Sequence, residues 1–283
     1  MLTITDSGIL IFALGHPYFG RYAFNLAVTI KAVENIAIAL VHDSTSITHL
    51  DEQQLAIFDQ LIPSDLPANC GAKLHAYDLS PFDKTLVLDA DMLWLPLHKP
   101  SELFDQLSGI EFTGITEGST DKPSSNYFFW ASVEEIRDKY KLDGVIYQWR
   151  TEVMYFEKSE KIKKIFSEAI SINKNHGLSK VKEFAEGVPD ELAINIATAK
   201  HGIGPHTHNW QPSFWPQMHG NQIPQADTLY REYYLLSAGG NMNTENTKQL
   251  YNRIVQAQAP KVGLSFCFPL QSKYQFLTER RKS

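Results

Sequence analysis

The sequence contains little cysteine, no long apolar run and no leader-like start. Its two cysteines, Cys70 and Cys267, lie far apart and share no metal-site spacing. We interpret them as reduced thiols, which argues against a disulfide-stabilised secreted protein. The amino terminus lacks a basic segment followed by an apolar one, and no apolar stretch reaches the roughly 18 to 20 residues of a membrane span. These absences predict a cytoplasmic protein with no signal peptide and no transmembrane segment.

Positive charge is not in excess either. The chain has 26 lysines and arginines against 32 aspartates and glutamates, a formal net charge of −6. Nucleic-acid-binding proteins generally present a basic surface, so no nucleic-acid partner is expected. An anionic ligand would need local cations or a metal ion. A chain of 283 residues is long enough for one large α/β domain or two small ones.

Strand and helix patterns alternate along the first third of the chain. Apolar runs rich in β-favouring residues predict strands at residues 8–14, 36–41 and 85–91, and helices are predicted between them at 21–33 and 51–61. This order is typical of a parallel sheet covered by helices. Such sheets bind ligands at the carboxyl ends of their strands, where Gly15, Asp43 and Asp89 are then expected to lie.

The second half of the sequence has a more mixed pattern. Further strands are predicted at residues 111–116, 151–156 and 230–236, a polar loop at 118–125, and helices at 101–107, 159–172, 190–199 and 247–256. No repeat or domain boundary is evident. We therefore predict a single domain over residues 1–283, with an irregular region at about 200–225 and a carboxy-terminal extension at about 257–283.

The strand predicted at residues 85–91 reads Thr-Leu-Val-Leu-Asp-Ala-Asp and ends on two carboxylates. Side chains alternate along a strand, so Asp89 and Asp91 are predicted to point the same way. Two such carboxylates repel each other unless a cation stands between them, and a hard divalent ion with positions open to phosphate oxygens fits this role. Asp-x-Asp is also a common start of a loop. Its apolar surroundings favour the functional interpretation, because burying unpaired charge costs on the order of several kcal/mol.

Four segments together resemble the GT-A glycosyltransferases, of the glycogenin and bacterial lipopolysaccharide galactosyltransferase type. They are the first strand with its loop, Leu88-Asp89-Ala90-Asp91, the strand at 151–156, and Pro189-Asp190-Glu191-Leu192-Ala193-Ile194-Asn195. The likeness covers residues 8–252, and only the Leu-Asp-Ala-Asp and Asp-Glu-x-x-x-Asn segments are at all specific. It implies a GT-A fold of the α/β class, with a mostly parallel central sheet flanked by helices.

The resemblance also implies an activity. It implies a metal-dependent hexosyltransferase that moves a sugar from a nucleotide-diphosphate sugar, with a UDP-sugar favoured, to a glycan, lipid or protein acceptor. Asp89 and Asp91 would hold Mn²⁺ or Mg²⁺ against the diphosphate, and Asp190 and Glu191 would face the transferred sugar or the acceptor. The likeness leans toward retention of the anomeric configuration. Contacts with the donor nucleotide are implied for Ala13, Gly15, Tyr18, Tyr22, Asp43, Lys73 or Tyr77, and Ala90.

Some of these residues have plain structural alternatives. Asp190 and Glu191 follow Pro189 at a helix start, where acidic side chains complement the helix dipole. Tyr18 and Tyr22 are four residues apart and are equally suited to helix packing. The aromatic group of Trp210, Phe214 and Trp215 suits either an acceptor platform or a core. Glu152 we interpret as a polar strand residue.

One departure from the family pattern concerns the third metal ligand. Relatives place a histidine ahead of a late glycine, whereas the matching stretch here has Ser237. A serine hydroxyl is a weak ligand beside imidazole. His206, His208 and His219 are the candidates to replace it, although an isolated loop histidine more often has no ligand role.

Two other function classes remain open. A non-catalytic GT-A-like binding or structural protein is compatible with the missing histidine. A sugar-phosphate nucleotidyltransferase would need a glycine-rich basic loop after the first strand, which Gly15-His16-Pro17-Tyr18-Phe19-Gly20-Arg21 matches poorly.

Overall fold

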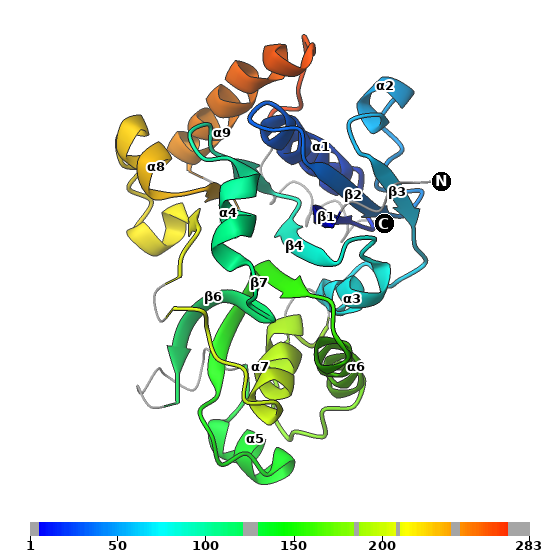
Figure 1. Ribbon diagram of the computed structural model, residues 1–283, viewed down its shortest axis with the longest axis vertical. Helices are drawn as coiled ribbons and strands as arrows, with labels where there is room; N and C mark the ends of the chain where they lie inside the picture. Colours follow the sequence, from blue (N-terminus) through cyan, green and yellow to red (C-terminus); the bar gives the residue numbers. More distant parts are fainter. Residues whose placement is uncertain (1–5, 121–129, 184–186, 208–209, 239–243, 271–283) are drawn as a thin grey trace.

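The computed structural model describes residues 6–120, 130–183, 187–207, 210–238 and 244–270. Its centre is a six-stranded sheet with the order β3-β2-β1-β4-β7-β6 (Figure 1). β1, β2, β3 and β4 run parallel, and β7 is antiparallel to both β4 and β6. The strands are β1 (Ser7–Ala13), β2 (Ala37–His42), β3 (Gln60–Pro63), β4 (Lys84–Asp89), β6 (Phe112–Ser119) and β7 (Tyr147–Glu157).

Helices cover both faces of this sheet, which explains why β1 and β4 read as continuous apolar runs. α1 (Pro17–Lys31) and α9 (Glu245–Gln258) share one hydrophobic cluster with Ile9 and Ile11 of β1. α6 (Glu160–Lys174) and α7 (Asp190–Lys200) share the cluster on the other face with Leu10. The alternation of Ile9, Leu10 and Ile11 between the two faces follows from the two-residue period of a strand.

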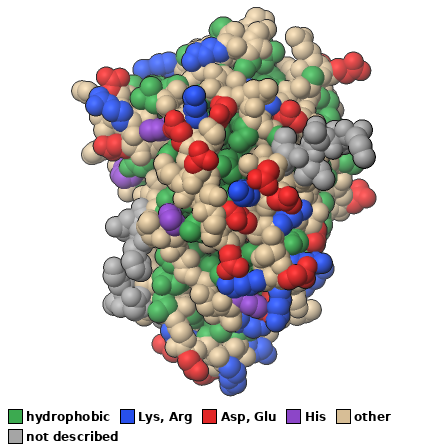
Figure 2. Space-filling model, in the orientation of Figure 1, with side chains coloured by type: hydrophobic (Ala, Val, Ile, Leu, Met, Phe, Trp, Pro, Cys, Tyr) green, Lys and Arg blue, Asp and Glu red, His purple; other side chains and the backbone are tan. Residues whose placement is uncertain are grey.

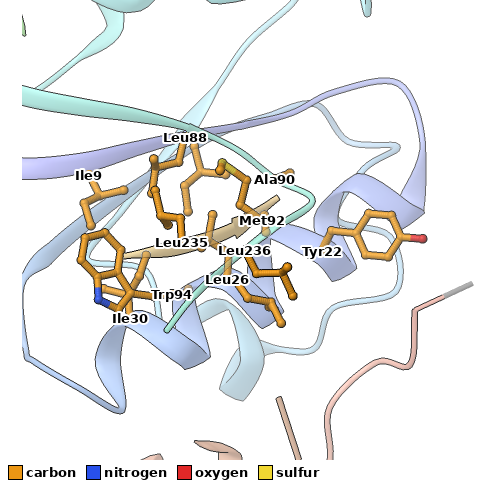
Figure 3. Close-up of a cluster of buried hydrophobic side chains, with 14 of the residues drawn as sticks. Ile9, Tyr22, Leu26, Ile30, Leu88, Ala90, Met92, Trp94, Leu235 and Leu236 are labelled. Carbon is orange, nitrogen blue, oxygen red and sulfur yellow. The ribbon is translucent and has the colours of Figure 1, made fainter. Parts of the chain in front are cut away.

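A second, three-stranded sheet with the order β5-β9-β8 packs against α1. It comprises β5 (Met92–Trp94), β8 (Ser213–Phe214) and β9 (Leu235–Ser237). Figure 3 shows Met92, Trp94, Leu235 and Leu236 gathered in one cluster with Leu26 and Ile30 of α1. Because β5 begins directly after Asp91, this buried sheet fixes the chain immediately beyond the acid pair.

The remaining elements are short. They are α2 (Glu52–Leu55), a 3₁₀ helix (Cys70–His75) leading into α3 (Ala76–Leu79), α4 (Pro100–Leu107), α5 (Val133–Tyr140), α8 (Ala226–Glu232), and 3₁₀ turns at Pro216–His219 and Ala259–Val262. Within the described part of the chain, no helix combines the length and apolarity needed to cross a bilayer.

The structure confirms the predicted mostly parallel α/β architecture and corrects several elements. The helix predicted at 51–61 stops at Leu55, and Gln60–Pro63 instead extends the sheet, because pairing with β2 outweighs local propensity. Of the strand predicted at 230–236, residues 230–232 belong to helix α8 (Ala226–Glu232), and only Leu235–Ser237 pair with β5. α5 was not predicted. Part of the loop predicted at 118–125 lies outside the described residues.

Two boundaries near the predicted site also differ. β4 ends at Asp89, and Asp91 lies in the turn before β5, so strand alternation does not orient this pair. α1 begins at Pro17 rather than at residue 21, because proline suits the first helical position and the His16 side chain accepts the Tyr18 N–H.

Candidate functional site

The carboxyl ends of β1, β2 and β4 meet at one edge of the central sheet. Phe12 pairs with Asp89, and Ala13 pairs with His42. The backbone N–H of Gly15 donates to Asp43 Oδ2 over 2.6 Å, and the N–H of Ser46 donates to Asp43 Oδ1 over 2.7 Å. Gly15 has φ +80°, a left-handed conformation that favours glycine. Asp43 therefore holds the loop after β1 closed, and Gly15, Asp43 and Asp89 share the expected edge.

Lys73 ties the end of β4 to two other segments. Its Nζ lies 2.8 Å from Asp89 Oδ1, 3.1 Å from both Thr151 O and Thr151 Oγ1, and 3.4 Å from Asp190 Oδ2. Burial disfavours the charged ammonium, but the carboxylates of Asp190 and Asp89 more than offset this, so the pKa of Lys73 is raised. The lysine is therefore a permanent cation that joins the 3₁₀ helix, β4, β7 and α7.

The two acids of the Asp-x-Asp pair differ in exposure. Asp89 is partly exposed, whereas Asp91 is buried. Desolvation raises the pKa of Asp89, Lys73 opposes this shift, and the neighbouring charge of Asp91 adds to it. The two carboxylates are thus close enough to repel each other. On the face seen in Figure 2, acidic and basic side chains are interspersed around the middle of the molecule.

α7 brings a second acid to Lys73. Asn195 Oδ1 accepts the backbone N–H of Trp149 over 2.9 Å, and Trp149 Nε1 donates to Thr198 Oγ1 over 2.8 Å, so α7 is docked on β7. This docking places Asp190, at the first position of α7, against the Lys73 ammonium. Asp190 is 3% exposed, and its Oδ2 has no hydrogen bond although it forms the ion pair with Lys73. Asp190 is therefore more than a helix-terminal acid facing solvent.

Glu191 is held differently from Asp190. Trp130 Nε1 donates to Glu191 Oε2 over 2.6 Å. Burial, together with the adjacent charge of Asp190, raises the pKa of Glu191 to about 8. Near neutral pH this carboxyl is mostly protonated, so it can donate a hydrogen bond as well as accept one.

This shifted pKa predicts a dependence of stability on pH. Between pH 4.5 and 8 the unfolded chain releases the Glu191 proton while the folded protein keeps it, so this group lowers stability as pH rises, by up to about 1.4 kcal/mol per pH unit. Glu191→Gln should therefore lose less unfolding free energy between pH 6 and pH 8 than the wild type, as measured by urea denaturation. The exposed control Glu232→Gln should follow the wild type. Parallel curves for Glu191→Gln and wild type would contradict the assignment.

Three of the residues implied for donor contact lie in the core. Ala13, Tyr22 and Ala90 are buried, and Figure 3 shows Tyr22 and Ala90 beside the residues of α1 and β5. Tyr22 is 3% exposed and meets Tyr251 edge-on at 6.4 Å. Tyr18 is half-buried and stacks on Tyr22 at 6.3 Å. The helix-packing alternative therefore describes the environment of Tyr22, and nucleotide contact by these residues stays a prediction.

Tyr77 does not lie beside the acid pair. Its hydroxyl donates to the carbonyl of Ser159 over 3.1 Å, and its ring packs on Phe156 and Phe166. Ser159 follows the end of β7 that pairs with Lys84, the first residue of β4. Asp89 lies at the opposite end of β4. Of the two implied alternatives, only Lys73 reaches the acid pair.

Two of the residues suggested as a third metal ligand have other side-chain partners. Ser237 Oγ donates to Glu152 Oε2 over 2.9 Å, and the His219 ring stacks on Phe214 at 4.7 Å. The backbone N–H of His206 donates to Thr113 Oγ1, a contact that does not involve its ring. His208 lies outside the described residues. No group of three or more His, Cys, Asp or Glu residues in the described ranges could hold a metal ion. A third protein ligand is therefore not identified.

The residues present nevertheless fit a hard divalent cation with open positions. Asp89 and Asp91 supply carboxylate oxygens, which Mg²⁺ and Mn²⁺ prefer, and Mg²⁺ sites commonly use one or two carboxylates together with substrate phosphates and water. The buried Asp190 Oδ2 without a hydrogen bond adds to the negative charge around the pair. Such a cation would be completed by ligands from outside the protein.

Sequence reasoning missed Arg150 and underrated Glu152. Arg150 donates to Glu152 Oε2 over 2.6 Å, pairs with Glu117 at 3.0 Å, and lies 3.8 Å from the centre of the Trp215 ring. Burial raises the pKa of Glu152, and the Arg150 charge opposes this. The signal in the sequence was the Arg-x-Glu pair within a strand rich in aromatic and apolar residues, because buried charges are rarely retained without partners. Of the aromatic residues suggested as an acceptor platform, Phe214 lies in the core and Trp215 contacts Arg150.

Two surface cavities lie along α9. One of about 450 Å³ is lined by residues that include Asn252, Gln256 and Phe266, and one of about 540 Å³ by residues that include Gln222, Asn246 and Arg253. Neither cavity is lined by Asp89 or Asp91.

Comparison with known proteins finds similarity in structure only. No protein-family model matches the sequence, and no curated protein matches it. The structure is similar to WbbM, a bifunctional glycosyltransferase, with a TM-score of 0.57 and 11% identity, covering 99% of this chain. The chain spans 53% of WbbM, about half of its length.

The galactosyltransferase LgtC is similar over nearly its whole length. A structure of LgtC in complex with donor and acceptor sugar analogs has a TM-score of 0.54 and 14% identity, covering 95% of this chain and 99% of LgtC. A structure of an LgtC active-site mutant has a TM-score of 0.53 at 14% identity, covering 88% of this chain and 95% of LgtC. At these identities the likeness establishes the fold. The chain has the GT-A glycosyltransferase fold, as its sequence resemblance implied.

Proposed function

We propose that this protein is a metal-dependent glycosyltransferase that uses a nucleotide-diphosphate sugar as donor. The observation that carries the proposal is the Lys73 centre, in which one buried ammonium lies 2.8 Å from Asp89 at the end of β4 and 3.4 Å from Asp190 at the start of α7. In parallel α/β sheets the carboxyl ends of the strands are where ligands bind. The acid pair and the α7 acids are thus gathered where a donor would lie in this fold.

The chemistry of transfer explains why a cation is required. A departing nucleoside diphosphate develops negative charge, and the described groups around the site are mainly carboxylates that would repel it. Asp89 and Asp91 would hold Mn²⁺ or Mg²⁺, which supplies Lewis-acid stabilisation of the leaving phosphate. Lys73 fixes the Asp89 carboxylate through a 2.8 Å hydrogen bond and adds a second positive charge.

The α7 acids have roles on the sugar side of this proposal. Asp190 pairs with Lys73 at 3.4 Å and would stabilise positive charge that develops on the transferred sugar. Glu191, with its pKa raised to about 8, would donate a hydrogen bond to a sugar hydroxyl. Both roles place these side chains on the donor sugar and the acceptor rather than on the nucleotide.

The proposal is tested by release of nucleoside diphosphate from a panel of sugar nucleotides. UDP-galactose is the first donor to try, because LgtC, which this structure resembles, is a galactosyltransferase. Each reaction is run with Mn²⁺, with Mg²⁺ and with EDTA, with and without simple glycan acceptors. Turnover that requires the metal supports the proposal, whereas absence of turnover across the panel contradicts it.

A non-catalytic GT-A-like binding protein is the second candidate. It is favoured by the finding that no three-residue metal-ligand group occurs within the described ranges. Titration calorimetry with UDP, in the presence and absence of Mn²⁺, separates the two functions. Metal-dependent UDP binding without turnover of any donor would favour the binding protein.

A further inference from the structure

Glu152 lies on β7 near the end of β4. β4 and β7 are antiparallel and pair as far as Leu88 with Val153, and Asp89 and Glu152 are the next residues on the two strands. Glu152 is buried, and its carboxylate is close enough to Asp89 for the two charges to interact.

The Glu152 carboxylate joins the central sheet to the small sheet. Ser213 Oγ of β8 donates to Glu152 Oε1 over 2.9 Å, and Ser237 Oγ of β9 donates to Glu152 Oε2 over 2.9 Å. Arg150 of β7 donates to the same Oε2 over 2.6 Å. Charge-assisted hydrogen bonds of this kind are stronger than neutral ones. One buried carboxylate therefore sets where β8 and β9 lie relative to β7.

β9 in turn holds the turn that carries Asp91. Ser237 pairs with Met92, and the backbone N–H of the next residue, Ala238, donates to the carbonyl of Asp91 over 3.1 Å. Asp89 is fixed separately by Lys73. The distance between the two acids of the pair is thus controlled from two sides, through Lys73 for Asp89 and through Glu152 and β9 for Asp91.

We propose that Glu152 is a positioning residue, which through its hydrogen bond to Ser237 holds Asp91 in the geometry that binds the divalent cation. The proposal rests on the proposed function, because it assumes that the acid pair binds a metal. Residues that orient metal ligands typically change metal affinity 10- to 100-fold when they are removed. Ser213 provides an internal comparison, since its hydroxyl bonds the same carboxylate but lies on β8, which does not pair with β5.

The test measures Mn²⁺ affinity by electron paramagnetic resonance of free Mn²⁺ in the presence of UDP, together with thermal unfolding by circular dichroism. Ser237→Ala should raise the Mn²⁺ Kd by about 10-fold, and Glu152→Gln should raise it by a similar factor. Ser213→Ala should leave the Mn²⁺ Kd within about twofold while losing an equivalent hydrogen bond. A purely structural role of Glu152 predicts equal effects of the two serine substitutions on both measurements.

The double variant separates positioning from direct ligation. If Ser237 acts only through Glu152, Ser237→Ala adds nothing to Glu152→Gln, whereas a direct ligand role would weaken Mn²⁺ binding further. Any one of three results would overturn this inference without affecting the proposed function. They are equal Kd changes for both serine variants, no change for either variant, and additive effects in the double variant. Absence of Mn²⁺ binding by the wild type, with and without UDP, would instead overturn the proposed function.

Discussion

Replacing Asp91 with asparagine is expected to lower nucleoside diphosphate release from the donor by about 100- to 1000-fold. The substitution keeps the shape of the side chain and removes one of the two negative charges proposed to hold the cation. Asp91 is chosen because Asp89 bonds Lys73, and replacement of Asp89 would disturb that ion pair. The electrostatic stabilisation of the leaving group should therefore be lost while the Lys73 contacts persist.

Initial rates at saturating Mn²⁺ and donor measure this effect, and Mn²⁺ titration shows whether the loss follows metal affinity. Asp65→Asn is a matched control, since Asp65 is exposed on the segment after β3. It should retain wild-type rates. Full activity and unchanged Mn²⁺ affinity in Asp91→Asn would exclude the acid pair as the metal site.

The sequence predicted the elements around this site well where a single pattern dominated. β1, β2 and β4 are runs of apolar residues buried on both faces, and their carboxyl ends met as expected from parallel pairing. Prediction failed where a tertiary contact decided the outcome. Residues 60–63 form a strand because β2 offers an open edge, and Asp59 reinforces that edge by accepting the Ile38 N–H.

The site itself was only partly predictable. The acids at 89, 91, 190 and 191 stood out because charge interrupts apolar sequence or opens a helix. Lys73, the cation that links Asp89 to Asp190, was implied only by the family resemblance and only as an alternative to Tyr77, because it lies 16 residues before Asp89 in a 3₁₀ helix and meets it through tertiary packing. Glu152 was judged a plain strand residue for the same reason, since its partners Ser213 and Ser237 are 61 and 85 residues away.

Replacing Lys73 with methionine is expected to destabilise the protein by about 3–5 kcal/mol, because removal of one partner leaves buried charge uncompensated. Two carboxylates would lose their cation at once, Asp89 at 2.8 Å and the buried Asp190 at 3.4 Å. Methionine has a similar length, so loss of packing should be small compared with loss of charge. Urea denaturation at pH 7 followed by tryptophan fluorescence measures the change. Lys161→Met removes an exposed pair with Glu111 and should cost at most about 1 kcal/mol.

The pH dependence of the Lys73→Met deficit distinguishes lost charge from lost packing. The raised pKa of Lys73 means that its stabilising contribution is fully present below the unfolded value near 10.5 and is lost only at higher pH. Across pH 5 to 8 the lysine is therefore charged in the wild type, and any change in the deficit comes from the carboxylates left behind. Burial raises the pKa of Asp89, and protonation of this carboxyl at lower pH removes uncompensated charge, so the deficit should shrink toward pH 5 and grow toward pH 8. A deficit that is constant over this range would show that Lys73 stabilises the fold by packing, and the charged centre that gathers β4, β7 and α7 would lose its main support.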